Sequence, residues 1–333
     1  ISTTGDITIA EDLTVSGDIV PSTPLSHRNF FINGGFDVWQ RGTSLAGATS
    51  FLADRWFNGT TETQSRQTFT VGQTDVSDSP TYYHRGSSGS TEWYGLKQRI
   101  ENVGILGGQT VTLSYWMKGS GTFTNSPFRG QNFGTGGSPS SEVNAALATH
   151  SVTTSWARYS QTFTMPSISG KTIGSDGVHT SYTQISVVRA SVNNITIDLA
   201  NVQLELGSSA TPFEHRTYGD ELARCQRYFT KNIQLSGSYT IVALGYAQSA
   251  TQCWAYVKYP VSMHSSPSIT FNNLLVGNNA VSPSVDSIGS IGFGTDSMRV
   301  VFVVTSGLTA GTHYNVSANN TATDSFVAFL AEL

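Results

Sequence analysis

The sequence is poor in charged residues, and this narrows the range of its partners. Only 12% of the 333 residues are Asp, Glu, Lys or Arg, whereas soluble domains usually carry roughly 25%. The formal net charge is −4. Such a chain offers no cationic field for nucleic acid or for an anionic membrane surface. We therefore expect neither nucleic-acid binding nor membrane insertion.

Cysteine and long apolar runs are scarce as well. Cys225 and Cys253 are too few for a disulfide scaffold or a thiolate metal site, and the sequence leaves open whether they form a bridge. The long uncharged run at 232–257 contains several Gln and Ser residues, so we expect no transmembrane helix. The chain begins at Ile1 without a secretory signal pattern, which indicates a fragment or a processed product.

Motifs that carry catalysis or bind metals are missing too. No Gly-x-Ser-x-Gly elbow, HExxH, CxxC or EF-hand loop occurs, and the seven histidines are scattered singly. We expect a protein that is not an enzyme. A fold can bring distant carboxylates together, so a hidden glycosidase-type pair stays open. Asp75 and Asp78 could ligate calcium, but acidic loop residues more often form solvated turns.

Hydroxyl, glycine and aromatic residues dominate what is present. The chain has 44 Ser, 41 Thr and 33 Gly beside 17 Phe, 13 Tyr and 6 Trp. This aromatic content at low net charge argues against disorder. Thr, Val, Ile, Tyr and Phe favour strands, and good helix formers such as Lys and Glu are few. The composition predicts an all-β protein with many short strands.

The first segment, 1–28, reads as a β stalk and linker. GDITI from Gly5 and GDIV from Gly17 form a near-repeat, and Pro21 and Pro24 then break the chain. A short strand repeat cannot bury its apolar face alone, whereas three copies from three chains can. We expect a trimerising stalk; a frayed terminus is the alternative.

Three further segments follow. Residues 29–216 are predicted to form a jelly-roll β-sandwich, with period-two strands at 67–71, 96–100, 110–117, 157–164, 183–188 and 195–206 and a long loop at 118–141. Residues 217–232 are predicted as a linking helix, because Leu222, Cys225 and Phe229 recur at helical spacing. Residues 233–333 are predicted as a C-terminal β-sandwich, with strands at 238–246, 252–259, 268–275, 298–305 and 325–330.

Two aromatic pairs bracket a Ser/Gly loop in YYHRGSSGSTEWY. An aromatic face stacks on the C–H side of a pyranose while hydroxyls and amides satisfy the remaining polar groups, so this loop is a candidate sugar platform. Neighbours along a strand point to opposite faces, so half of these rings are expected in the core. The candidate contacts here are Tyr82, Tyr83, Trp93 and Tyr94.

Two stretches resemble phage tail-fibre proteins. NFFINGGFDVWQRGTS from Asn29, followed by FLADRW from Phe51, looks like the opening of a jelly roll similar to carbohydrate-binding modules. VQLELGSSATPFEHRTYGDELARCQRYF from Val202 looks like its closing strand and exit into a helix. The likeness covers 29–229. Within these motifs we expect Phe36 and Trp39 in the core.

The motif FLADRW contains two oppositely charged neighbours. We expect its neighbouring Asp54 and Arg55 to pair and to fix the entry loop. The family resemblance also implies a structural calcium between an acid on the opening strand and another on the closing strand. Asp37 fits the first position, but Ala200 and Asn201 stand at the second and provide no carboxylate. With this departure from the pattern, we expect no cofactor.

The resemblance also implies partners and a location. It predicts a homotrimer on the virion, acting extracellularly, whose N-terminus contacts other tail proteins and whose C-terminal β domain meets a host cell-surface glycan. In NNLLVGNNAVSPS, amide side chains crowd a Gly/Pro loop where sugar hydroxyls would find partners, although Asn also favours turns. The candidate contacts here are Asn272, Asn273, Asn278 and Asn279.

Three functions remain after these observations. The favoured one attaches a virion to a host glycan through weak contacts that trimeric avidity strengthens. The second is a purely structural virion fibre, connector or decoration protein. The third is a tail-associated polysaccharide depolymerase. No spacing of Asp and Glu residues in the sequence indicates the catalytic carboxylate pair that it would need.

Overall fold

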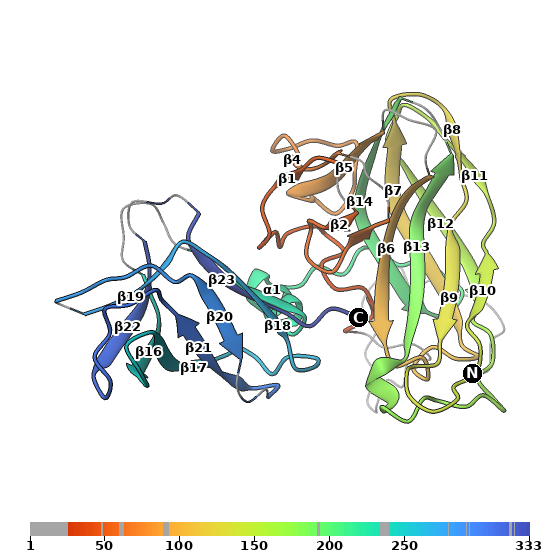
Figure 1. Ribbon diagram of the computed structural model, residues 1–333. Helices are drawn as coiled ribbons and strands as arrows, with labels where there is room; N and C mark the ends of the chain where they lie inside the picture. The colour runs from red at the N-terminus through yellow and green to blue at the C-terminus, as the bar shows by residue number, and fades with distance from the viewer. Residues whose placement is uncertain are drawn as a thin grey trace, which may run out of the picture.

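The computed structural model describes residues 26–333 apart from 48, 60–62, 89–92, 192–193, 234–239, 279, 291, 293, 320–321 and 323. The predicted stalk at 1–28 therefore lies almost wholly outside the described residues. The described chain is nearly all β, as the composition predicts, and forms two bodies with one α-helix between them (Figure 1). No helix among these residues is long and apolar enough to cross a membrane.

The larger body is a sandwich of two six-stranded antiparallel sheets. In spatial order, the first sheet contains β1 (Ser44–Leu45), β4 (Thr63–Thr68), β5 (Tyr82–Ser88), β14 (Ile195–Leu206), β7 (Thr110–Gly119) and β12 (Ala157–Thr164). The second contains β10 (Val143–Ala146), β9 (Phe128–Asn132), β13 (Tyr182–Ser191), β6 (Trp93–Glu101), β3 (Phe57–Asn58) and β2 (Ser50–Phe51). β8 (Phe123–Asn125) and β11 (His150–Val152) pair separately. The predicted long loop at 118–141 therefore contains two strands, β8 and β9.

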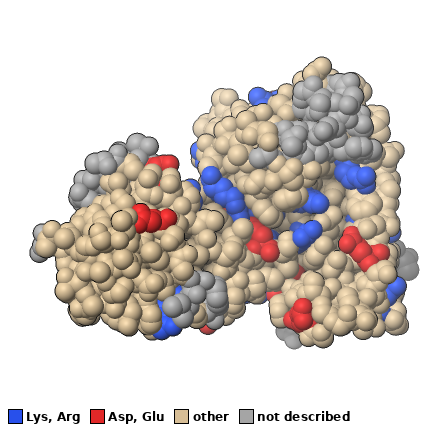
Figure 2. All heavy atoms as spheres, in the orientation of Figure 1, with Lys and Arg blue, Asp and Glu red and all other residues tan. Residues whose placement is uncertain are grey.

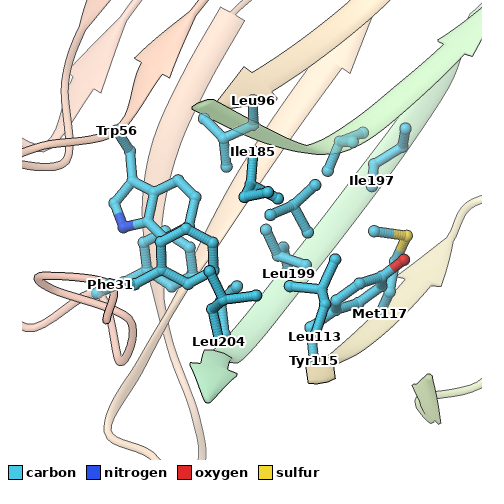
Figure 3. Packing of buried hydrophobic residues seen from close by; sticks show 14 of the residues in the cluster. Phe31, Trp56, Leu96, Leu113, Tyr115, Met117, Ile185, Ile197, Leu199 and Leu204 are labelled. Carbon is cyan, nitrogen blue, oxygen red and sulfur yellow. The ribbon is translucent and has the colours of Figure 1, made fainter. Parts of the chain in front are cut away.

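The core of the larger body lies between these sheets. Leu113 on β7 and Leu204 on β14 are cross-strand partners with no exposed surface. They pack toward Leu96 and Ile185 of the opposite sheet, with Trp56 closing one side (Figure 3). Each such side chain contributes roughly 1.5–3 kcal/mol by leaving water. Phe36 and Trp39 are also buried in this cluster, which confirms the expectation for the opening motif.

The smaller body packs a three-stranded sheet against a six-stranded one. The first contains β15 (Phe229–Ile233), β23 (Phe326–Leu330) and β18 (Ser268–Asn272). The second, in spatial order, contains β19 (Leu274–Gly277), β22 (His313–Ala318), β16 (Ile241–Ala247), β17 (Gln252–Lys258), β21 (Ser297–Val303) and β20 (Ser287–Ser290). Phe302 and Phe329 are among the residues buried between them.

The linking helix is shorter than the predicted 217–232. Helix α1 spans Tyr218–Gln226, and the Thr217 hydroxyl caps it by accepting from the Asp220 amide. Phe229 continues the helical spacing of Cys225, yet it begins strand β15 and pairs with Leu330. Hydrogen-bonded pairing with β23, which is distant in sequence, outweighs the helical spacing of the local residues here. A short 3₁₀ helix, Val178–Thr180, lies in the larger body.

Arginines join the two bodies. Arg41 and Arg55 both pair with Glu332, whose side chain is nearly buried. Their guanidinium groups lie over Phe229 and Tyr228, at 3.6 and 3.5 Å from the ring centroids. The expected Asp54–Arg55 pair is wrong, because Asp54 binds Arg41 at 3.1 Å and Arg55 turns toward the C-terminal segment.

Candidate functional site

The six-stranded sheet of the smaller body turns an aromatic row away from its core. On β16 and β17 the register places Leu244 opposite Tyr256 and Tyr246 opposite Trp254. Side chains two apart on a strand share a face, so these four lie together. Ala255, between the two β17 aromatics, is fully buried on the other face. Strand alternation thus separates an outer aromatic row from an inner aliphatic one.

This row lines an open hollow of about 490 Å³. Tyr256 is 67% exposed, Leu244 68% and Tyr246 37%, values that are unusual for such large apolar groups. Polar side chains supply the neighbouring wall, with His313 and Asn315 from β22 and Asn278 from the turn after β19. The hollow combines ring faces with hydrogen-bonding groups.

A glycine and an arginine lie next to the aromatic row. A Cβ on Gly245 would lie 2.4 Å from the carbonyl oxygen of Trp254, so no larger residue fits without moving the strands. The Arg299 guanidinium lies 4.5 Å from the Trp254 ring centroid and covers one side of the indole. Apart from such isolated groups, the visible face of the smaller body carries few charges (Figure 2).

The aromatic candidates of the larger body are separated by their strand. Tyr82 and Tyr83 are consecutive on β5, so they point to opposite faces, and both are half-buried. Tyr83 packs against Phe69 and Trp156 at ring-centroid distances of 4.7 and 5.4 Å. Tyr82 lies under Arg66. These two rings form no common platform.

The other two aromatic candidates, Trp93 and Tyr94, begin strand β6. Their side chains lie outside the described residues. Sugar binding by Tyr82, Tyr83, Trp93 or Tyr94 stays a prediction.

The side chains of three asparagine candidates form hydrogen bonds within this protein. The amides of Asn272 and Asn273 each donate to Asp324, both at 2.6 Å. The Asn278 side-chain oxygen accepts from the backbone amides of Ala280 and Val281, which is an Asx-type turn. Asn278 also lines the hollow described above. Asn279 lies outside the described residues, and glycan contact by all four stays a prediction.

The calcium position that the family resemblance implies is a small polar cavity of about 50 Å³ between Asp37 and Asn201. Burial and the nearby charge of Glu221 raise the pKa of Asp37. Asn201 takes a positive φ of 48° at the bulge in β14, and its buried Oδ1 has no hydrogen-bond partner. Calcium usually takes six to eight oxygens, several from carboxylates, and among the described residues Asp37 is the one acid that lines this cavity. The donors present do not make a calcium site.

The described residues show little that indicates a catalytic site. They contain no group of three His, Cys, Asp or Glu side chains placed to hold a metal ion. His84 is fully buried beside Phe36 and Trp39, and burial lowers its pKa to about 3. Cys225 and Cys253, whose pairing the sequence left open, are both free and buried. These groups belong to the cores.

Sequence reasoning missed Tyr246, Trp254, Tyr256 and His313 as candidates. One signal was available, because aromatic and apolar residues recur at every second position in LGY and WAY around the short turn between β16 and β17. The third strand of the hollow, β22, lies far along the chain and reaches it by pairing with β16 and β19.

No protein family model matches the chain, and no curated protein matches it. Among solved structures, the CBM22-2 xylan-binding domain of Xyn10C from Paenibacillus barcinonensis is 14% identical, with a TM-score of 0.33 over 46% of this chain and 92% of that one. TmCBM61, solved with β-1,4-galactotriose, is 14% identical, with a TM-score of 0.32 over 54% of this chain and 99% of that one.

A phage protein also matches in part. The enzymatically active domain of bacteriophage CBA120 tailspike protein 4 is 14% identical, with a TM-score of 0.29 over 54% of this chain and 21% of that one. All three TM-scores lie below 0.5, so these likenesses do not decide the function of this chain.

Proposed function

We propose that this protein is an adhesion protein, not an enzyme, and that it binds a glycan through the hollow on the outer face of the six-stranded sheet. One observation carries the proposal: Tyr246, Trp254 and Tyr256 share one exposed face beside His313, Asn278 and Asn315. Ring faces stack on the C–H side of a sugar, and the imidazole and amides pair with its hydroxyls.

The dimensions of the hollow suit this role. About 490 Å³ falls within the 300–1,000 Å³ typical of small-ligand sites. The hollow is open, so an oligosaccharide can cross it with both ends free. A platform on paired strands is also rigid, which lowers the ordering cost of binding. An open site of this kind gives modest affinity for each copy.

The biological setting that fits best is a phage tail fibre or receptor-binding protein that attaches the virion to a host cell-surface glycan. The motifs at Asn29–Trp39 and the closing strand β14 support it through their resemblance to tail-fibre proteins. A trimer would present three hollows at once. Linked sites raise the effective affinity by 10²–10⁴ without any new contact, which compensates for a weak single site.

Competition for binding to cells tests this function. The labelled full-length protein should bind host cells, and purified surface polysaccharide from those cells should displace it. Tyr256→Ala should reduce cell binding, whereas Tyr218→Ala should not, because Tyr218 is similarly exposed but lies on α1. Binding that polysaccharide cannot displace would overturn the proposal.

A structural role in the virion is the second candidate, and one observation favours it. Leu244 at 68% and Ile241 at 54% exposure are aliphatic groups on the same sheet as the tyrosines. Aliphatic side chains suit burial against a second copy better than sugar contact. If Leu244→Asp dissociates the oligomer while cell binding needs no polysaccharide, the hollow is a packing surface and the structural role holds.

A further inference from the structure

We infer that the glycan in the hollow of the smaller body carries an N-acetyl group, and that Leu244 contacts the methyl of this group. This sugar class rests on the proposed function, since the same hollow binds the sugar. A plain hexose leaves one lining residue unexplained. The Leu244 side chain lines the hollow and is 68% exposed, although it is neither an aromatic ring nor a polar group.

The neighbours of Leu244 come from the two strands beside it. Leu244 on β16 lies opposite Asn315 of β22 and opposite Tyr256 of β17. Directly opposed residues of antiparallel strands project to the same face, with Cβ atoms about 4.5–5.5 Å apart. Leu244 therefore lies between an amide and a phenol ring in one row across the sheet. Both neighbours are exposed, so a single ligand can contact all three side chains.

An aliphatic side chain in this position suits a methyl group better than a hydroxyl group. The leucine can neither donate nor accept a hydrogen bond. A sugar hydroxyl placed against Leu244 would lose water without gaining a partner, and this costs free energy. A methyl placed there would instead remove apolar surface of both partners from water. Leu244 therefore indicates a sugar that carries a methyl group.

The polar neighbours indicate which methyl-bearing group enters. Within the part of the chain that the structure describes, the exposed Asn315 side chain has no hydrogen-bond partner, so its amide offers donors and an acceptor. Asn278, which also lines the hollow, uses its Oδ1 for the backbone amides of Ala280 and Val281 and has its Nδ2 as a donor. An acetamido group combines a methyl, a carbonyl and an N–H within a few bonds. It matches this set, whereas the methyl of a 6-deoxy sugar has no amide beside it.

The charge around Leu244 agrees with a neutral substituent. Among the described residues, those that line the hollow include no Asp, Glu, Lys or Arg. Arg299 of β21 lies opposite Tyr256, on the side away from Leu244, and its guanidinium covers the Trp254 ring. A cationic amino sugar would gain most from a carboxylate, and an acidic sugar from a cation. The acetamido group needs neither.

Saturation-transfer NMR of the full-length protein tests this with five probes: N-acetylglucosamine, N-acetylgalactosamine, glucose, galactose and the 6-deoxy sugar fucose. At least one N-acetyl sugar should bind about tenfold more tightly than its parent hexose, with the strongest saturation on its acetyl methyl. Leu244→Ala should weaken binding of that sugar about fourfold, as the lost burial of a methyl implies, and leave hexose binding unchanged. Ile241→Ala should change neither, because Ile241 is 54% exposed on the same strand but does not line the hollow.

The outcomes separate the sugar class from the function of the hollow. Circular dichroism confirms that each variant is folded. If host polysaccharide binds and Tyr256→Ala weakens it, yet N-acetyl sugars bind no better than hexoses, the N-acetyl assignment fails and the proposed function stands. A preference for fucose, or an N-acetyl preference that Leu244→Ala retains, would also overturn the assignment. A protein that binds neither the five sugars nor the polysaccharide would overturn both.

Discussion

Tyr246 and Trp254 face each other across strands β16 and β17, with ring centroids 6.1 Å apart and planes inclined at 58°. The pair forms a tilted aromatic surface rather than a closed stack. His313 continues the row on the next strand, opposite Tyr246. A ligand crossing the three strands would meet two rings and an imidazole in turn.

The tilted pair predicts how Tyr246 contributes. Tyr246→Ala should weaken glycan binding roughly threefold to tenfold, since a stacked ring is worth about 0.5–1.5 kcal/mol. Tyr246→Phe should keep most of the affinity, because the ring face remains and only the hydroxyl is lost. Titration calorimetry with an oligosaccharide from a glycan array measures both variants. An equal loss in the two would show that the hydroxyl, not the ring face, makes the contact.

The joint between the bodies should depend on Glu332. Glu332→Gln leaves Arg41 and Arg55 without their shared carboxylate, and breaking a buried ion pair costs roughly 3–5 kcal/mol. Chemical denaturation should show a loss of that order. Glu142→Gln, at an exposed site, should change the free energy of unfolding by less than about 0.5 kcal/mol. Equal effects of the two variants would mean that the joint does not depend on this pair.

Acid should destabilise the larger body through His84. Burial lowers the pKa of His84 from 6.5 to about 3. The unfolded chain takes up a proton near pH 6.5 and the folded chain does not, so the stabilising effect is complete above pH 6.5 and is lost as pH falls toward 3. At 1.36 kcal/mol per pKa unit, the loss reaches roughly 5 kcal/mol at the acid end.

The matched variant for this prediction is His84→Gln, which can still donate to Gln64. The free energy of unfolding should fall more steeply between pH 6.5 and 4 for the wild type than for the variant. His150 and His264 titrate in both proteins, so the difference isolates His84. Parallel curves would contradict a buried neutral His84.

Both thiols should be unreactive in the folded protein. Burial raises the pKa of Cys225 well above its ordinary value, with the charges of Asp54 and Glu221 adding to the effect, and burial raises that of Cys253 to about 11. The thiolate is the reactive form. A disulfide exchange reagent at neutral pH should modify neither cysteine until denaturant is added, and then both. A denatured sample that gives no free thiol without a reductant would reveal a bridge.

Strands with a clear pattern were predictable, and strands that depend on distant partners were not. β12 (Ala157–Thr164) alternates strictly between exposed and half-buried residues, and β14 (Ile195–Leu206) alternates apolar with polar residues on either side of its bulge. Both strands agree with their predicted limits. β15 was predicted as helix, because Phe229 fits the spacing of Cys225. Its pairing with β23, near the end of the sequence, decides otherwise.

The candidate site was less accessible from sequence than the fold. The sequence predicted sites at an aromatic loop and at asparagine-rich turns. In the structure, the side-chain amides of Asn272 and Asn273 donate to Asp324. Tyr82 and Tyr83 point to opposite faces of strand β5. The hollow needs β16, β17 and β22 in a specific register. Register is set by the core face of all three strands together, and no local pattern encodes it.

Titration of the full-length protein with a glycan that it binds on an array tests the central claim most directly. The account predicts saturable binding by the wild type, roughly threefold to tenfold weaker binding by Tyr256→Ala, and unchanged binding by the similarly exposed control Tyr218→Ala. Tyr256→Ala should keep the wild-type unfolding midpoint, since its ring is 67% exposed. Binding that survives in Tyr256→Ala, or a wild type that binds no glycan, would contradict the assignment of the hollow.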